Sequence, residues 1–211
     1  MRVVILISGR GSNMRALLEA GLPVEFACVI SNRADAQGLE TAAAHGVPTQ
    51  VLNHRDYPDR AAFDAALAAE IDRHAPDLVI LAGFMRVLSD AFVQHYERRL
   101  INIHPALLPA FPGLDTHARA LAGGVKLHGC TVHFVTPEVD SGPILVQAAV
   151  PVLGDDTAAI LAARVLEQEH RIYPQAVRWF AEGRVLWRED GTVSVRGRAD
   201  MARAALVSPG D

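Results

Sequence analysis

The sequence predicts an α/β fold in a single domain, with a mostly parallel central sheet flanked by helices. Short apolar runs of strand type alternate with segments of helical periodicity between residues 3 and 82. No internal repeat or low-complexity linker divides the chain, and its 211 residues, 50% of them hydrophobic, suffice for one buried core. Such alternation is typical of a parallel sheet whose crossover connections are helices.

The first half of the chain contains the alternating series. Strands are expected at 3–7, 24–31, 48–52 and 77–82, and helices at 13–20, 37–45 and 60–74. Phe63, Leu67 and Ile71 illustrate the helical signal, because they recur at the spacing of one helical face.

The second half is less regular. Strands are expected at 100–103, 130–135 and 144–152, a proline-rich loop runs to Gly113, and a long helix at 157–181 closes the core. Segments 184–187 and 192–195, joined through Asp190-Gly191, predict a β-hairpin. Residues 201–211 are small and polar and predict a frayed tail, which leaves 1–200 as the catalytic domain.

Composition excludes several classes of protein. A formal net charge of −4 and a pI near 6.1 disfavour a nucleic-acid partner. The early apolar run Val3–Ile7 is too short for a signal peptide, and no run is long enough for a membrane helix, so we expect a cytoplasmic protein without a membrane partner. Cys28 and Cys130 lie in apolar runs without metal-pair spacing, which predicts buried, reduced thiols and no metal.

A glycine-rich loop follows the first expected strand. Backbone N–H groups at Gly11, Ser12 and Asn13, next to the start of a helix, suit an anion such as phosphate. Dinucleotide binding is disfavoured because Met14 stands where the third glycine of that fingerprint is needed. The alternative is a turn that needs glycine for packing, with Ser12 and Asn13 as ordinary helix caps.

Asn102, His104 and Asp140 are the candidate catalytic residues. Asn102 and His104 have period-2 spacing, so both side chains leave one face of a strand near its C-terminal end, where open α/β sheets place their sites. An amide, an imidazole and a carboxylate can together stabilise an oxyanion and manage one proton. The alternative for a lone histidine is a satisfied core residue, and His133 in TVHFV leaves the same two interpretations open.

Ordered segments along the chain resemble phosphoribosylglycinamide formyltransferases. They are LISGRGSNM, SNRADAQGLE, LAGFMRVLS, INIHPALLP, HGCTVHFVTPEVDSGPIL and LEQEHRIYP, which together span most of the sequence. The resemblance implies a Rossmann-like fold and transfer of a formyl group from 10-formyltetrahydrofolate to the amine of 5-phosphoribosylglycinamide in purine biosynthesis. The formyl folate is a cosubstrate, no metal is expected, and the oligomeric state stays open between monomer and homodimer.

The resemblance also implies roles for individual residues. The ribose phosphate would contact Gly11, Ser12 and Asn13, and the glycinamide part Leu166, Glu167, Gln168 and Glu169. The folate would contact Arg60, Met85, Arg86, Val87, Leu88, Asn102, Thr136, Pro137, Glu138, Val139 and Asp140. The catalytic group would be Asn102, His104 and Asp140. Departures from the family pattern occur at Arg10, Asp115 and Ser141.

Alternative interpretations remain open for the segment Met85–Leu88 and for the activity. Met85, Val87 and Leu88 follow a buried strand and are also explained as plain core, whereas Arg86 among them needs a charged or polar partner. The alternative activities are a deformylase-type hydrolase that uses the same donor and a non-catalytic folate- or nucleotide-binding module. A binding module has no need for an amide, an imidazole and a carboxylate in one cleft.

Overall fold

A computed structural model describes residues 1–197 and 208. Its strands are β1 (Arg2–Ile7), β2 (Glu25–Ser31), β3 (Thr49–Val51), β4 (Leu78–Leu81), β5 (Leu100–His104), β6 (Leu127–Phe134), β7 (Ile144–Pro151), β8 (Val185–Trp187) and β9 (Val193–Val195). Its helices are α1 (Ser12–Glu19), α2 (Gly38–Ala44), α3 (Arg60–Arg73), α4 (Asp90–His95), α5 (Thr116–Ala122) and α6 (Ala158–Ala181), with a 3₁₀ turn at His54–Asp56.

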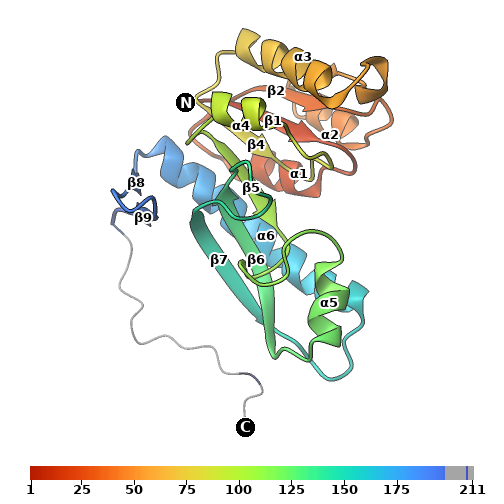
Figure 1. Cartoon of the computed structure of the whole chain (residues 1–211), viewed down its shortest axis with the longest axis vertical. Coiled ribbons are helices and arrows are strands. Elements are labelled where there is room, and N and C mark those ends of the chain that lie inside the picture. The colour runs from red at the N-terminus through yellow and green to blue at the C-terminus, as the bar shows by residue number, and fades with distance from the viewer. Residues whose placement is uncertain (198–207, 209–211) are drawn as a thin grey trace. The chain divides into compact units, whose positions relative to one another are not determined.

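Strands β1 to β7 form one sheet in the order β3-β2-β1-β4-β5-β6-β7, and β8 pairs with β9 (Figure 1). The ladders that join β3, β2, β1, β4 and β5 are parallel, whereas β7 is antiparallel to β6. The predicted mostly parallel sheet, long C-terminal helix and β-hairpin are therefore confirmed. The predicted frayed tail at 201–211 lies outside the described residues, apart from residue 208.

By its internal contacts the chain divides into two compact units. The first comprises Met1–Asn102 with Phe134–Val139, and the second comprises Ile103–His133 with the described residues from Asp140 onward. The single catalytic domain expected over 1–200 stays a prediction.

The core of the first unit lies where α3 and α4 cover one face of its sheet. Phe63, Leu67 and Ile71 of α3 are fully buried in a cluster with side chains of β1, β2 and β4, which confirms the helical face expected from their spacing. Strand β4 is buried along its whole length, as expected for a parallel strand covered on both faces. Figure 1 shows α3 along these strands.

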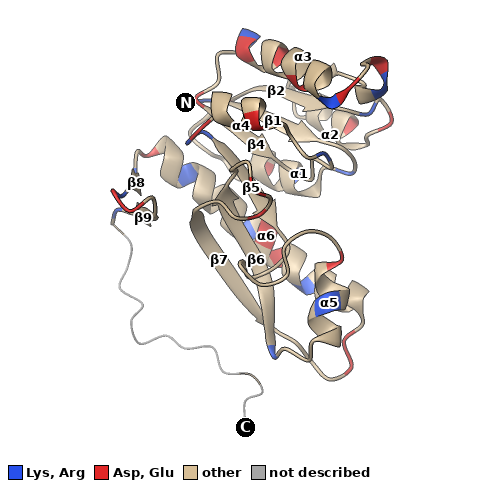
Figure 2. Ribbon diagram, in the orientation of Figure 1, with Lys and Arg blue, Asp and Glu red and all other residues tan. Residues whose placement is uncertain are grey.

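The second unit is built on the antiparallel pair β6 and β7, and α6 packs against β7. Neither strand carries an acidic or basic residue other than histidine, so both are uncoloured along their length in Figure 2. Helix α6 begins after Thr157, whose hydroxyl accepts a hydrogen bond from the Ile160 N–H at 3.2 Å. The titratable side chains in the interior of this unit therefore lie beside two strands that carry no Asp, Glu, Lys or Arg.

The sequence did not predict helices α4 and α5. Each has at most seven residues, so the helical periodicity in its sequence is weak, although the equally short α2 was predicted. A signal was present for α4, because Ser89 is its N-cap and its hydroxyl accepts from the Phe92 N–H at 3.5 Å. Within the described part of the chain, no helix has the length and apolar character needed to cross a membrane.

Candidate active site

His104 ends strand β5 and is held between two acceptors. Its Nε2 lies 2.9 Å from the Phe111 carbonyl oxygen, and its Nδ1 lies 3.3 Å from Oδ2 of Asp140. A carbonyl oxygen only accepts, so Nε2 carries a proton and donates it to Phe111. The other ring nitrogen, Nδ1, faces the Asp140 carboxylate. His104 is 5% exposed, so the pair is shielded from water.

Asp140 contacts three groups of the second unit. Its Oδ2 accepts a hydrogen bond from the Gly113 N–H at 2.8 Å, in addition to its contact with His104. His133 Nε2 lies 3.7 Å from Oδ1, and the His133 side chain is 2% exposed. His133 is therefore a buried histidine that also adjoins the proposed catalytic carboxylate, so its two interpretations are compatible. The structure brings His104 and Asp140 together as predicted.

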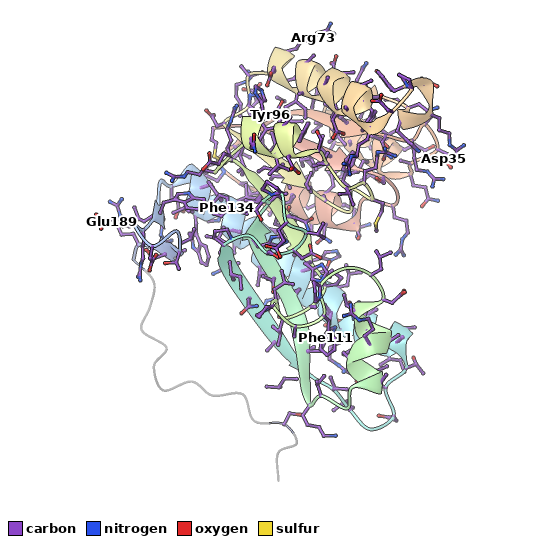
Figure 3. The ribbon with its side chains drawn as sticks, viewed as in Figure 1. Asp35, Arg73, Tyr96, Phe111, Phe134 and Glu189 are labelled. Carbon is purple, nitrogen blue, oxygen red and sulfur yellow. The ribbon has the colours of Figure 1, made fainter. Side chains whose placement is uncertain are left out.

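Phe111 is a participant that the sequence analysis missed. Its φ of 55° lies in the left-handed region, which is uncommon outside glycine. Its ring lies between β6 and α5, with the His128 centroid at 5.8 Å and the Arg119 guanidinium at 5.7 Å (Figure 3). The functional group is a main-chain carbonyl, which every residue has, so no side-chain pattern could identify it.

Two further histidines border this region of the second unit. His117 and His128 form a T-shaped pair with centroids 5.2 Å apart, and His128 is 1% exposed. Burial first, then the neighbouring His117, lowers the pKa of His128 to about 4. Burial, followed by repulsion from His104, also lowers the pKa of His117. His128 is therefore neutral at pH 7 and adds no positive charge beside His104.

Asn102 lies on the same strand as His104, two residues earlier and in the first unit. It is partly buried and stands opposite Leu81 of β4 in the parallel register. The expectation that Asn102 and His104 present an amide and an imidazole on one face of the strand stays a prediction.

The glycine loop of the first unit is shaped by close packing. Gly11 has φ 72° and is the N-cap of α1, and a Cβ placed on it would lie 3.0 Å from the Gly38 Cα. The Gly38 N–H also donates to the Gly9 carbonyl at 3.0 Å. The packing interpretation of this loop is thus supported. Ser12 and Asn13 were expected as caps, but they stand in the first turn of α1, and its cap makes no side-chain hydrogen bond.

Ser8 connects Asn32 to the segment Met85–Leu88 within the first unit. Its hydroxyl donates to Asn32 Oδ1 at 2.6 Å and accepts from the Met85 N–H at 2.8 Å. Met85 is 76% exposed and Val87 57%, whereas Leu88 is 7% exposed and belongs to the hydrophobic cluster. The plain-core interpretation is therefore right for Leu88 and wrong for Met85 and Val87.

Arg86 has an incomplete set of partners. Its guanidinium carbon lies 5.0 Å from the centroid of the Phe63 ring, which is a cation–π contact. Its Nε is buried and has no hydrogen-bond acceptor within the described residues.

Two other predicted folate contacts lie elsewhere in the first unit. Arg60 is exposed as the first residue of α3. In the segment from Thr136 to Val139, the Thr136 hydroxyl donates to the Glu138 carbonyl at 3.1 Å.

The predicted glycinamide contacts lie on α6 in the second unit. Of Leu166, Glu167, Gln168 and Glu169, only Glu169 is buried, with 7% exposure. Burial, then the charge of Glu169, raises the pKa of Cys130 to about 12, and the same two causes raise the pKa of Tyr173. Glu169 therefore brings a carboxylate into the interior of this unit. Cys28 and Cys130 are both buried and free, as predicted.

Comparisons with known proteins agree on one family. A sequence model described as Formyl transferase matches residues 1–177. The chain is 50% identical over 194 residues to the phosphoribosylglycinamide formyltransferase of Escherichia coli (strain K12), covering 90% of this chain and 92% of that protein. It is 46% identical to the trifunctional purine biosynthetic protein adenosine-3 of Homo sapiens, covering 91% of this chain but 19% of that protein.

A solved structure gives the same result. The chain superimposes on glycinamide ribonucleotide transformylase 1 from Symbiobacterium toebii with a TM-score of 0.89 and 51% identity, covering 92% of this chain and 93% of that one. Sequence and fold match over nearly the full length of the E. coli and S. toebii proteins. The chain therefore belongs to the formyl transferase family, and within it to the phosphoribosylglycinamide formyltransferases.

Proposed function

We propose that the chain transfers a formyl group from 10-formyltetrahydrofolate to the amine of 5-phosphoribosylglycinamide, with Asn102, His104 and Asp140 as the catalytic residues. The observation that carries this proposal is the buried His104, which lies 2.9 Å from the Phe111 carbonyl and 3.3 Å from Asp140. A histidine held in this way keeps a proton ready to donate. The activity is the one for which the E. coli relative is named.

The reaction forms one bond to the formyl carbon and breaks another. The neutral amine attacks that carbon, its oxygen becomes an oxyanion, and the bond to N10 of the folate then breaks. Asn102 donates an N–H to the oxyanion, and Nε2 of His104 exchanges its Phe111 acceptor for the same oxygen. A proton passes from the attacking amine to N10, through His104 or through a water beside Asp140. Removing one such donor costs about 10²–10³ in rate.

The remaining residues are proposed to bind the two substrates. The start of α1 at Gly11, Ser12 and Asn13 would bind the ribose phosphate, because the N-terminus of a helix attracts anions. The buried carboxylate of Glu169 suits the amine end of the other substrate, with Leu166, Glu167 and Gln168 beside it on α6.

The folate is proposed to contact exposed apolar side chains and one incompletely paired cation. Met85 and Val87 offer apolar surface, and Arg86 has a buried Nε that a folate carboxylate can accept from. Arg60, Leu88, Asn102 and the segment Thr136–Asp140 complete this proposed site. A cytoplasmic location and small-molecule partners without nucleic acid follow from the same proposal.

The test is formyl transfer by the whole chain. We expect 10-formyltetrahydrofolate to be consumed only when phosphoribosylglycinamide is present, as followed by absorbance. Consumption at the same rate without the amine would favour the deformylase-type alternative. Binding of folate without any consumption would favour the non-catalytic module.

A further inference from the structure

Thr131 and Gln147 form a hydrogen-bonded clamp on the segment that follows His104. The Thr131 hydroxyl donates to the Ala106 carbonyl at 2.7 Å and accepts from the Leu108 N–H at 3.1 Å. Gln147 Nε2 donates to the Leu108 carbonyl at 2.8 Å and to the Thr131 hydroxyl at 2.9 Å. One side chain from β6 and one from β7 thus hold both polar main-chain groups of Leu108.

The direction of each hydrogen bond in the clamp is fixed by its partners. The carbonyl of Ala106 only accepts, so the Thr131 hydroxyl donates there and its two lone pairs accept from Leu108 and Gln147. A hydroxyl has one proton and two lone pairs, so Thr131 uses its complete capacity. The Leu108 carbonyl likewise requires the NH₂ end of the Gln147 amide. Thr131 is 0% exposed, so water does not replace its bonds to Ala106 and Leu108 in the folded protein, whereas Gln147 reaches the segment from an exposed position of β7.

Along the chain, the clamped segment lies between His104 and Phe111, whose carbonyl His104 contacts. Ala106 and Leu108 lie on the chain between His104 and Phe111, and the Ala106 N–H also donates to the His104 carbonyl at 2.9 Å. Fixing Ala106 and Leu108 therefore fixes the path by which the Phe111 carbonyl reaches His104 Nε2. The hydrogen bonds of Thr131 and Gln147 go to the Ala106 and Leu108 main chain and to each other, so their effect on the imidazole is transmitted through this segment.

We infer that Thr131 and Gln147 are positioning residues that orient His104 by fixing the Ala106–Leu108 main chain. This inference rests on the proposed catalytic role of His104. A displacement of a catalytic group by about 1 Å can cost 10²-fold in rate. The clamp therefore acts on the chemical step and leaves substrate binding largely unchanged.

The first test removes the clamp and then restores it. Thr131→Val has nearly the same shape but no hydroxyl, and we expect kcat to fall by roughly tenfold to a hundredfold while both KM values stay within about twofold. Thr131→Ser keeps the hydroxyl and should restore kcat to within about threefold of wild type. Gln147→Leu, on the less buried strand, should lower kcat in the same sense and keeps the test usable if Thr131→Val does not fold.

A control separates positioning from stability. Val132→Ala changes the next, fully buried residue of β6, whose side chain lies on the opposite face of the strand. It should lower Tm by at least as much as Thr131→Val while kcat stays within about twofold of wild type. The inference is wrong if kcat of Thr131→Val follows Tm as it does in Val132→Ala, or if KM rises while kcat is unchanged.

A second comparison separates this inference from the function on which it rests. If His104→Ala retains the wild-type kcat, the proposed role of His104 fails, and the inference fails with it. If His104→Ala is impaired while folded Thr131→Val and Gln147→Leu are both fully active, the clamp alone is overturned. Combining Thr131→Val with Gln147→Leu should cost little more than Thr131→Val, because both substitutions break the same clamp.

Discussion

His128 predicts a loss of stability between neutral and mildly acidic pH. Its ring is 1% exposed and lies against the rings of Phe111 and His117. Burial and His117 lower its pKa from 6.5 to about 4, and the Pro105 backbone opposes this shift only in part. In the unfolded chain the same imidazole takes up a proton near its ordinary pKa.

The sign of the effect follows from proton uptake. Between pH 6.5 and 4 the unfolded state binds a proton that the native state does not, so the free energy of unfolding falls as pH falls. The stabilising contribution is complete above the ordinary pKa and is lost below it. Lowering the pKa from 6.5 to about 4 corresponds to roughly 3 kcal/mol in total. About 2 kcal/mol of this is lost between pH 7 and pH 5.

The assay is urea unfolding of the wild type and of His128→Leu at pH 7 and pH 5. Leucine keeps an apolar contact with Phe111 but does not titrate, so the wild type should lose about 2 kcal/mol more than the variant between the two pH values. Groups common to both proteins cancel in this difference. Equal losses, or a His128 ring that titrates near 6.5 by NMR, would refute the reasoning.

Three further predictions concern His104, Gly11 and Cys130. His104→Ala should lower kcat by about 10² or more with little change in Tm, while His95→Ala, at an exposed ion pair of the first unit, should retain kcat. Gly11→Ala should destabilise by more than about 1 kcal/mol in urea unfolding, whereas Gly9→Ala, with open space around it, should change stability by less than about 0.5 kcal/mol. The Cys130 thiol, whose pKa is about 12, should resist iodoacetamide at pH 8 until urea unfolds the chain, as measured by mass spectrometry.

The strands and long helices could be predicted because burial leaves a direct record in the sequence. Val3 to Ile7 is apolar at every position and fully buried in β1, and the spacing of Phe63 and Leu67 matches the buried face of α3. A strand buried on both faces needs apolar residues throughout, and a long helix repeats its apolar face several times. Helices α4 and α5 complete fewer than two such repeats, so their periodicity is weak, and length alone does not explain the difference from the seven-residue α2, which was predicted.

The candidate site was predictable only where side chains define it. His104 and Asp140 were paired from residue type and from the family resemblance, and the structure places His104 Nδ1 3.3 Å from Asp140 Oδ2. The Phe111 carbonyl and the Gly113 N–H, which complete their environment, are main-chain groups without a sequence signal. Exposure could not be read either, since Met85, Val87 and Leu88 are all apolar but only Leu88 is buried.

The glycine loop shows why one pattern supported two interpretations. A left-handed Gly11 lets the loop turn at the start of α1, and the missing side chain lets Gly38 approach, so structural and anion-binding roles require the same residue. A substitution at Gly11 changes both roles and cannot separate them. Ser12 stands in the first turn with φ and ψ that other residues adopt, so Ser12→Ala preserves the fold of the loop. A selective rise in KM for the ribonucleotide in Ser12→Ala would therefore assign phosphate binding to this turn without disturbing its packing.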